Sequence, residues 1–150
     1  MRFLLVDRIL NWESDGTIRG LKCVTIAEDY FTDHFPGNPV MPGVLLLESL
    51  VQLAGWGEAA TSDFRHWLLL DRVQRCAIYS TVIPGDVLEL SVTPLGPAAR
   101  GRRAYSGTAS VAGRKRARAE FEGTLHTLEG LADPAGSRAA FARLARETRS

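Results

Sequence analysis

Residues 33–48 decide how the chain is interpreted, and they read Asp33-His34-Phe35-Pro36-Gly37-Asn38-Pro39-Val40-Met41-Pro42-Gly43-Val44-Leu45-Leu46-Leu47-Glu48. A histidine lies in a proline-stiffened segment, and an apolar run follows it. Pro42 suits the first turn of a helix, so we predict a loop up to Met41 and a helix from Pro42 through Ala54. That helix is apolar on nearly every side, as expected for a buried one. Two glycines after Ala54 predict a loose last turn.

Glu48 is the one carboxylate in the apolar run, and Gln52 lies one helical turn later on the same face. Burial disfavours a charged carboxylate, so Glu48 is expected to be able to donate a proton. The backbone N–H at Gly43 lies at the positive end of the helix, where negative charge is stabilised. His34 as base, the Gly43 N–H as oxyanion donor and Glu48 as acid are the groups needed to remove water from a 3-hydroxyacyl thioester. No metal or redox cofactor is required for it.

The rest of the chain alternates between strand-like segments and turns. We predict strands at 3–12, 17–27, 67–83, 86–95, 102–112 and 115–128. One buried helix among many strands indicates an α+β fold, in which a curled antiparallel sheet wraps around one long helix. Residues 1–129 would form this domain. Residues 130–150 would add a linker and a short helix at 137–149, with Phe141, Leu144 and Ala145 on one face.

The motif resembles the active-site signature of the FabZ-type 3-hydroxyacyl-acyl-carrier-protein dehydratases, which have the hot-dog fold. The resemblance covers about residues 3–125: it includes the opening strand Phe3–Arg8, the segment His34–Gly37, the segment Pro39–Leu45, the interval of fourteen residues from His34 to Glu48, and a weaker match at 84–90. It implies a homodimer or a trimer of dimers, whose sites each take His and Glu from different subunits. The substrate would be carried on the phosphopantetheine of an acyl carrier protein, with no other cofactor.

The residues that this resemblance assigns fall into two groups. The catalytic pair would be His34 and Glu48. The oxyanion and substrate-binding positions would be Gly43, Val44, Gln52, Phe35 and Pro42. The chain also departs from the family pattern: Asp33 stands where the family usually has Gly, and Ala77-Ile78-Tyr79 stand where it tends to have Arg-Phe. These departures suggest a specialised pathway, such as polyketide-like or lipid secondary metabolism, rather than housekeeping fatty-acid synthesis.

Charge is distributed unevenly along the chain. Residues 1–99 carry 7 Lys and Arg against 12 Asp and Glu, whereas residues 100–150 carry 11 against 5. A single basic face would suit an acidic acyl carrier protein. The alternative is that these residues are only the solvated face of a strand pair. The residues predicted to dock the carrier are Arg100, Arg102, Arg103, Arg114, Lys115 and Arg116.

Other classes of protein fit the sequence less well. No apolar run approaches the roughly 20 residues of a membrane-spanning helix, and no secretory signal is evident, so we expect a cytoplasmic protein without a membrane span. Cys23 and Cys76 have no metal-binding spacing and are expected to be buried thiols. Aromatic residues do not interleave with the arginines, which argues against nucleic acid as a partner. A hot-dog acyl thioesterase and a non-catalytic acyl-binding subunit remain as alternative functions.

Overall fold

The computed structural model describes residues 4–146, and these residues form one six-stranded antiparallel sheet. The strand order across the sheet is β1-β2-β4-β5-β6-β3. The strands are β1 (Arg8–Trp12), β2 (Ile18–Cys23), β3 (His66–Ile78), β4 (Val87–Pro94), β5 (Arg102–Val111) and β6 (Arg114–Thr127). The predicted strand at 3–12 is shorter than expected, because β1 begins at Arg8, although the Asp7 N–H still donates to the Leu21 carbonyl oxygen of β2; Phe3 lies outside the described residues. The strands predicted at 17–27 and 67–83 also end earlier, at Cys23 and Ile78. The predicted antiparallel architecture is confirmed.

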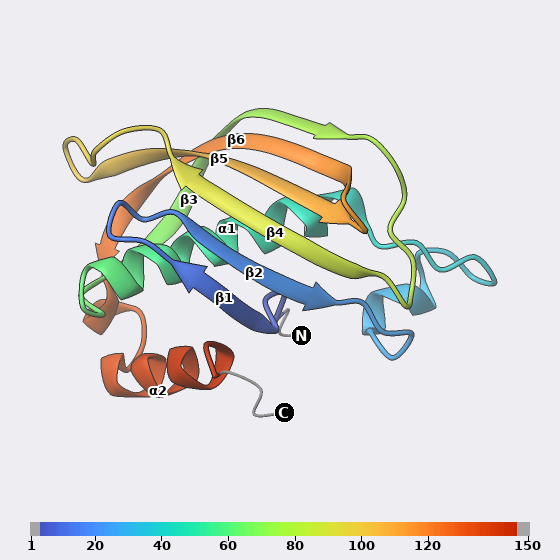
Figure 1. Ribbon diagram of the computed structural model, residues 1–150, viewed down its shortest axis with the longest axis horizontal. Helices are drawn as coiled ribbons and strands as arrows, with labels where there is room; N and C mark the ends of the chain where they lie inside the picture. Colours follow the sequence, from blue (N-terminus) through green and yellow to red (C-terminus); the bar gives the residue numbers. More distant parts are fainter. Residues whose placement is uncertain (1–3, 147–150) are drawn as a thin grey trace.

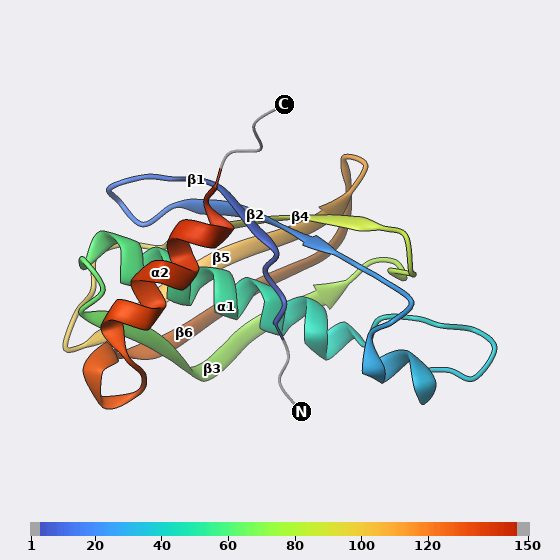
Figure 2. The same cartoon turned by 90° about the horizontal axis from the view of Figure 1, so that it is seen from below.

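The sheet curls around α1 (Gly43–Thr61), which runs across its concave side (Figures 1 and 2). Leu46, Leu50 and Leu53 are almost completely buried. Each such side chain stabilises the fold by roughly 1.5–3 kcal/mol relative to exposure. Facing strands supply the other half of the core through alternate residues, as in β4, where Leu88, Leu90 and Val92 point inward. Within residues 4–146 no helix is both long enough and apolar enough to span a membrane.

The predicted loose end of the long helix is wrong. Helix α1 continues through Gly55 and Gly57 to Thr61. A Cβ atom at position 55 would lie 2.5 Å from the ring of Trp67, and one at position 57 would lie 3.1 Å from the Gly16 carbonyl oxygen. The two glycines therefore allow the helix to pack directly against neighbouring chain segments. Burial against those segments outweighs the cost of glycine in a helix interior, which is about 1 kcal/mol per residue relative to alanine.

Two short elements and a second helix complete the chain. These are η1 (Asp29–Thr32), which lies within the loop predicted ahead of the long helix, η2 (Leu128–Gly130) and α2 (Pro134–Leu144). Helix α2 begins three residues earlier than predicted, since the Asp133 side chain accepts hydrogen bonds from the Ala135 and Gly136 N–H groups and caps its start. It ends at Leu144, so residues 145 and 146 are not helical as predicted, and the predicted residues 147–149 lie outside the described residues. Phe141 of α2 is buried against the end of α1 and packs on the rings of Trp12, Trp56 and Phe64.

Strand β3 forms one edge of the sheet and is hydrogen-bonded on one side only, to β6. All residues from Leu69 to Ile78 are exposed, including several large apolar ones. Cys76 lies on this edge and Cys23 ends β2, and both thiols are exposed, so the expectation that they are buried is wrong. An exposed edge with apolar side chains is a surface on which another strand can pair.

Candidate functional site

His34 follows η1 and lies at the start of the loop that projects from one end of the molecule. Its Nδ1 lies 2.7 Å from the Val40 carbonyl oxygen. A carbonyl oxygen only accepts hydrogen bonds, so this contact places the imidazole proton on Nδ1 and leaves the lone pair of Nε2 available. The ring also stacks on Phe35, with ring centroids 4.0 Å apart. The loop therefore holds the imidazole in an orientation suited to a base.

A cavity of about 270 Å³ brings His34 together with the start of α1. His34, Gly43 and Tyr79 are among its lining residues. Gly43 is the first residue of α1, so its N–H has no acceptor within the helix and can donate to a ligand. A Cβ atom at position 43 would lie 3.2 Å from Ile78 of β3. Glycine thus lets the helix start approach the strand closely.

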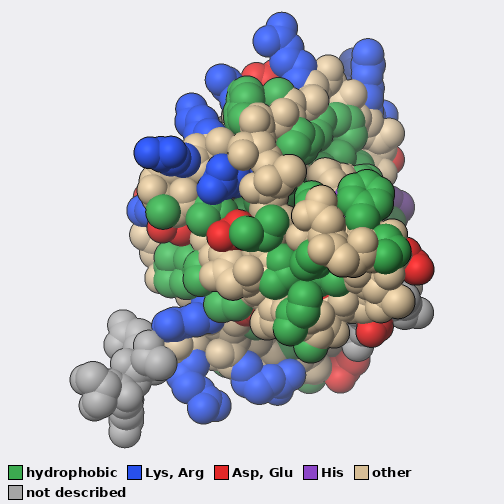
Figure 3. All heavy atoms as spheres, turned by 90° about the vertical axis from the view of Figure 1, so that its right-hand side faces the viewer, with side chains coloured by type: hydrophobic (Ala, Val, Ile, Leu, Met, Phe, Trp, Pro, Cys, Tyr) green, Lys and Arg blue, Asp and Glu red, His purple; other side chains and the backbone are tan. Residues whose placement is uncertain are grey.

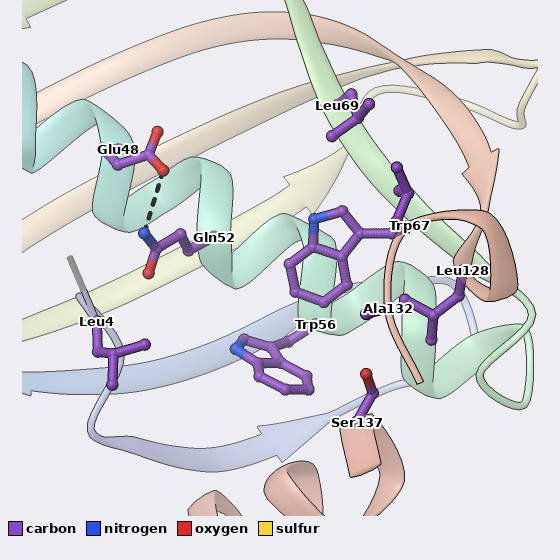
Figure 4. A pocket seen from close by; sticks show the side chains of 10 residues that line it. Leu4, Glu48, Gln52, Trp56, Trp67, Leu69, Leu128, Ala132 and Ser137 are labelled. Carbon is purple, nitrogen blue, oxygen red and sulfur yellow. Dashed lines mark hydrogen bonds between the residues drawn. The ribbon is translucent and has the colours of Figure 1, made fainter. Parts of the chain in front are cut away.

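Glu48 lies farther along α1, half-buried, on the wall of a different cavity of about 400 Å³. The Gln52 Nε2 donates a hydrogen bond to the Glu48 Oε1 at 3.1 Å. The Leu5 N–H donates in turn to the Gln52 Oε1 at 2.9 Å, which fixes which way the amide faces. The predicted pairing of Glu48 with Gln52 on one face of the helix is confirmed, and Figure 4 shows their hydrogen bond.

The remaining predicted binding residues lie around the start of α1. Pro42 immediately precedes the helix, and Val44 and Phe35 are exposed to 68% and 50%. Two large apolar side chains exposed beside the His34 cavity are available to contact another molecule. Within the single chain, the cavity at His34 and the cavity at Glu48 have different lining residues.

The basic residues do not form the single face predicted from the sequence. Arg102 pairs with Thr124 across the β5–β6 hairpin, whereas Val111 pairs with Arg114 at its turn. Nine residue steps of about 3.3 Å separate Arg102 from Val111, which is roughly 30 Å. Figure 1 shows the β5–β6 turn at the same end of the molecule as the loop that follows η1, and the β4–β5 loop at the opposite end. Arg114, Lys115 and Arg116 are therefore near the His34 cavity, and Arg100 and Arg102 are not.

Arg103 also points inward, contrary to the prediction that it is part of a docking surface. Its Nη1 donates to the Glu58 Oε1 at 2.9 Å, and its other nitrogens donate to the carbonyl oxygens of Gly96 and Asp15. The Tyr105 hydroxyl donates to the same Glu58 oxygen. Burial, together with this hydrogen bond, raises the pKa of Tyr105. Arg103 is thus the partner that neutralises a buried carboxylate, and this requirement fixes its direction.

Comparison with known proteins places the chain in a family. The sequence model of the FabA-like domain matches residues 1–120. The chain belongs to the FabA-like family. It is 39% identical over 137 residues to the 3-hydroxyacyl-acyl-carrier-protein dehydratase FabZ of Janthinobacterium sp. (strain Marseille), a match that covers 89% of this chain and 87% of that protein. FabZ of Haemophilus influenzae is 36% identical, over 74% of this chain and 76% of that protein. The resemblance inferred from residues 33–48 is confirmed.

Solved structures support the fold. The structure of smu.793 from Streptococcus mutans bound to acetyl CoA matches 85% of this chain and 94% of its own, with a TM-score of 0.65 at 12% identity. One chain of the dehydratase heterocomplex ApeI:P from Xenorhabdus doucetiae matches 74% of this chain and 88% of its own, with a TM-score of 0.55 at 13% identity. These likenesses concern the fold alone. Together with the sheet topology, they confirm the predicted hot-dog fold.

Sequence reasoning missed most of the residues around Glu48 in this FabA-like chain. Trp56 and Trp67 form a wall of the cavity, and Leu128, Ala132 and Ser137 lie at its end away from Glu48 (Figure 4). The position of Trp56 was available as a signal, since it lies one helical turn after Gln52 and two after Glu48. The other residues come from distant parts of the chain, and no local pattern connects them to the helix.

Proposed function

We propose that this protein removes water from a 3-hydroxyacyl thioester carried by an acyl carrier protein and releases the trans-2-enoyl thioester, in fatty-acid or polyketide-like biosynthesis. The observation that carries this proposal is the placement of His34 beside the first N–H of α1, with its Nδ1 against the Val40 carbonyl oxygen. That arrangement gives a base and an oxyanion donor in one cavity. Membership of the FabA-like family, and relatives named as dehydratases, support the same reaction. The cytoplasmic location expected from the sequence is part of the proposal.

The reaction divides into two proton transfers. The His34 Nε2 takes a proton from C2 of the substrate, and the electron pair of that C–H bond moves toward the thioester, whose oxygen accepts a hydrogen bond from the Gly43 N–H. The C2–C3 double bond then forms as the C3–O bond breaks, and Glu48 donates a proton to the departing hydroxyl to form water. A proton returned from His34 to Glu48 restores both groups. These steps use the chain's own side chains and no metal or redox cofactor.

We propose a homodimer in which each site combines His34 of one subunit with Glu48 of the other. The two residues line different cavities of one subunit, which favours sites completed by a second copy. Strand β3 offers the contact surface: its outer edge is unpaired within the described chain, and Leu70, Val73 and Ile78 are exposed there to 38%, 38% and 46%. Pairing of this strand with its copy would give the backbone N–H and C=O groups of the edge hydrogen-bond partners and would cover those side chains.

The carrier protein would dock at the end of the molecule that carries the His34 loop. Figure 3 views this end and shows apolar side chains over its middle, with Lys and Arg side chains along its upper and left borders and a further group at its lower border. We define the basic rim as Arg114, Lys115, Arg116 and Arg118 of β6. An acidic carrier bound to this rim would deliver a flexible thioester arm to the neighbouring cavity. Attraction between opposite charges would mainly accelerate the encounter of the two proteins.

Incubation of the purified protein with a short 3-hydroxyacyl thioester tests the reaction. We expect the enoyl thioester as product. Release of free thiol would indicate a thioesterase instead, and neither product would indicate a non-catalytic acyl-binding subunit. His34→Ala should reduce the rate by about 10²–10⁴-fold, as expected for loss of a general base. His126→Ala is the matched control, because His126 is an exposed histidine at the far end of β6.

A further inference from the structure

The cavity beside Glu48 extends away from the proposed chemistry toward the C-terminal segment. It lies between the Glu48–Gln52 pair at one end and a group of C-terminal residues at the other (Figure 4). Its volume is about 400 Å³. The lining residues are Leu4, Glu48, Gln52, Trp56, Trp67, Leu69, Leu128, Leu131, Ala132 and Ser137.

The chemistry of this lining suits an uncharged aliphatic chain. Glu48 is the one ionisable side chain among the ten, and Trp56, Trp67 and several leucines supply most of the wall. The two indole rings meet edge to face, with centroids 5.1 Å apart. A wall that is apolar beyond its reacting end favours an acyl chain over a polar or charged group.

The far end of the cavity is built by η2, α2 and the turn between them. Leu128 is buried, and its carbonyl oxygen accepts hydrogen bonds from the N–H groups of Leu131 and Ala132, which fixes that turn. Phe141 of α2 packs on Trp56 with ring centroids 6.0 Å apart and so holds the indole in the wall. The segment therefore supplies both the end of the cavity and the support for one side of it.

A second cavity, of about 530 Å³, adjoins the first along the same segment. It shares Leu4, Gln52, Trp56, Ala132 and Ser137 with the first cavity. Its other lining residues are Val6, Asp133 and four residues of α2, which are Gly136, Ala140, Arg143 and Leu144. The start of α2 thus forms part of the wall of both cavities, which adjoin along their common residues. Its position determines how much of that combined space an acyl chain that starts at Glu48 can reach.

We propose that residues 128–137 end the acyl-binding channel and set the longest chain that the protein accepts. This inference rests on the proposed dehydration, because that function places the reacting carbons at Glu48. One water molecule occupies about 30 Å³ in liquid water. If each carbon of the chain occupies a similar volume, the cavity holds on the order of ten carbon atoms. Chains near that length reach Ala132 and Leu131, and shorter ones do not.

Three variants test this over a series of 3-hydroxyacyl thioesters from four to fourteen carbons. Ala132→Phe places a ring in the cavity, and we expect kcat/KM to fall about tenfold or more for chains of ten carbons while the four-carbon substrate is unaffected. Leu131→Ala removes bulk from the same end and should extend activity toward longer chains. Ala139→Phe is the matched control: Ala139 is an exposed alanine of α2 that lines neither cavity, and it should leave the chain-length profile unchanged.

Binding of saturated acyl-pantetheines, measured by calorimetry, separates this inference from the proposed reaction. Ala132→Phe should weaken binding of the ten-carbon compound about tenfold and leave the four-carbon compound unchanged. If the unmodified protein forms no enoyl product yet shows this difference in binding, the proposed reaction fails and the channel inference stands. If Ala132→Phe and Ala139→Phe give the same chain-length profile in both assays, the inference is overturned.

Discussion

Mixed dimers of His34→Ala and Glu48→Gln subunits would test the shared site directly. The two residues line different cavities in one subunit, so we place them in one site only through the partner. A mixed dimer would then contain one site with both residues intact and one site with neither. The amide oxygen that Glu48→Gln introduces can still accept the hydrogen bond from Gln52, so the substitution removes the acidic proton with little change in packing.

The expected magnitudes follow from the symmetry of the dimer. Each variant alone should lose about 10²–10⁴-fold in rate, which corresponds to about 2.7–5.5 kcal/mol of transition-state stabilisation. Random assembly makes about half of the dimers mixed, and each mixed dimer has one working site of two. An unseparated co-expressed mixture should therefore recover about a quarter of the unmodified activity, and mixed dimers purified away from both parents about half, far above either parent.

The measurement is the rate of enoyl thioester formation by dimers isolated through two different affinity tags, one on each subunit. A reciprocal pair is the control: a subunit with both substitutions joined to an unmodified subunit. Shared sites leave that dimer with one lesion in each site and nearly inactive, whereas sites within one subunit leave it about half active. Activity in the reciprocal pair, together with none in the mixed pair, would refute the shared site.

Three further outcomes are expected. Arg114→Glu combined with Lys115→Glu should slow turnover of carrier-bound substrate about tenfold or more at low salt and spare a short thioester mimic. Arg100→Glu, at the far end of the hairpin, is the control. Equal loss on both substrates would mean that the two residues serve the fold instead. Val73→Asp on the exposed β3 edge should yield monomers in sedimentation equilibrium, and intact dimers would place the interface elsewhere. Tyr105→Phe removes a donor to a buried carboxylate and should lower the free energy of unfolding by about 1–3 kcal/mol in urea titrations at pH 7. Because the folded protein holds the Tyr105 proton above pH 10, where the unfolded chain loses it, stability should fall as pH rises past about 10, and this variant should show a weaker fall.

Part of the site could be predicted from short stretches of sequence. His34, Gly43, Glu48 and Gln52 lie within nineteen residues, and helical spacing alone places the last two on one face. The strand pattern succeeded for a similar reason, since alternation along β4 and β5 reports which side chains are buried. The end of α1 was predicted wrongly, because the space that Gly55 provides is used by Trp67, a residue outside the helix.

The sequence by itself determined the sheet around one helix and the residues that carry the proposed chemistry, because helix starts, alternation and turn residues are set by neighbours along the chain. The tertiary structure alone decided the rest. It turned Arg103 inward, since the carboxylate of Glu58 that needs it lies 45 residues away. It placed the two arginine groups at opposite ends of one hairpin, and it set the end of the Glu48 cavity with residues from the other end of the chain. Each of these depends on contacts between residues that only the folded chain brings together, and local sequence patterns carry no information about such partners.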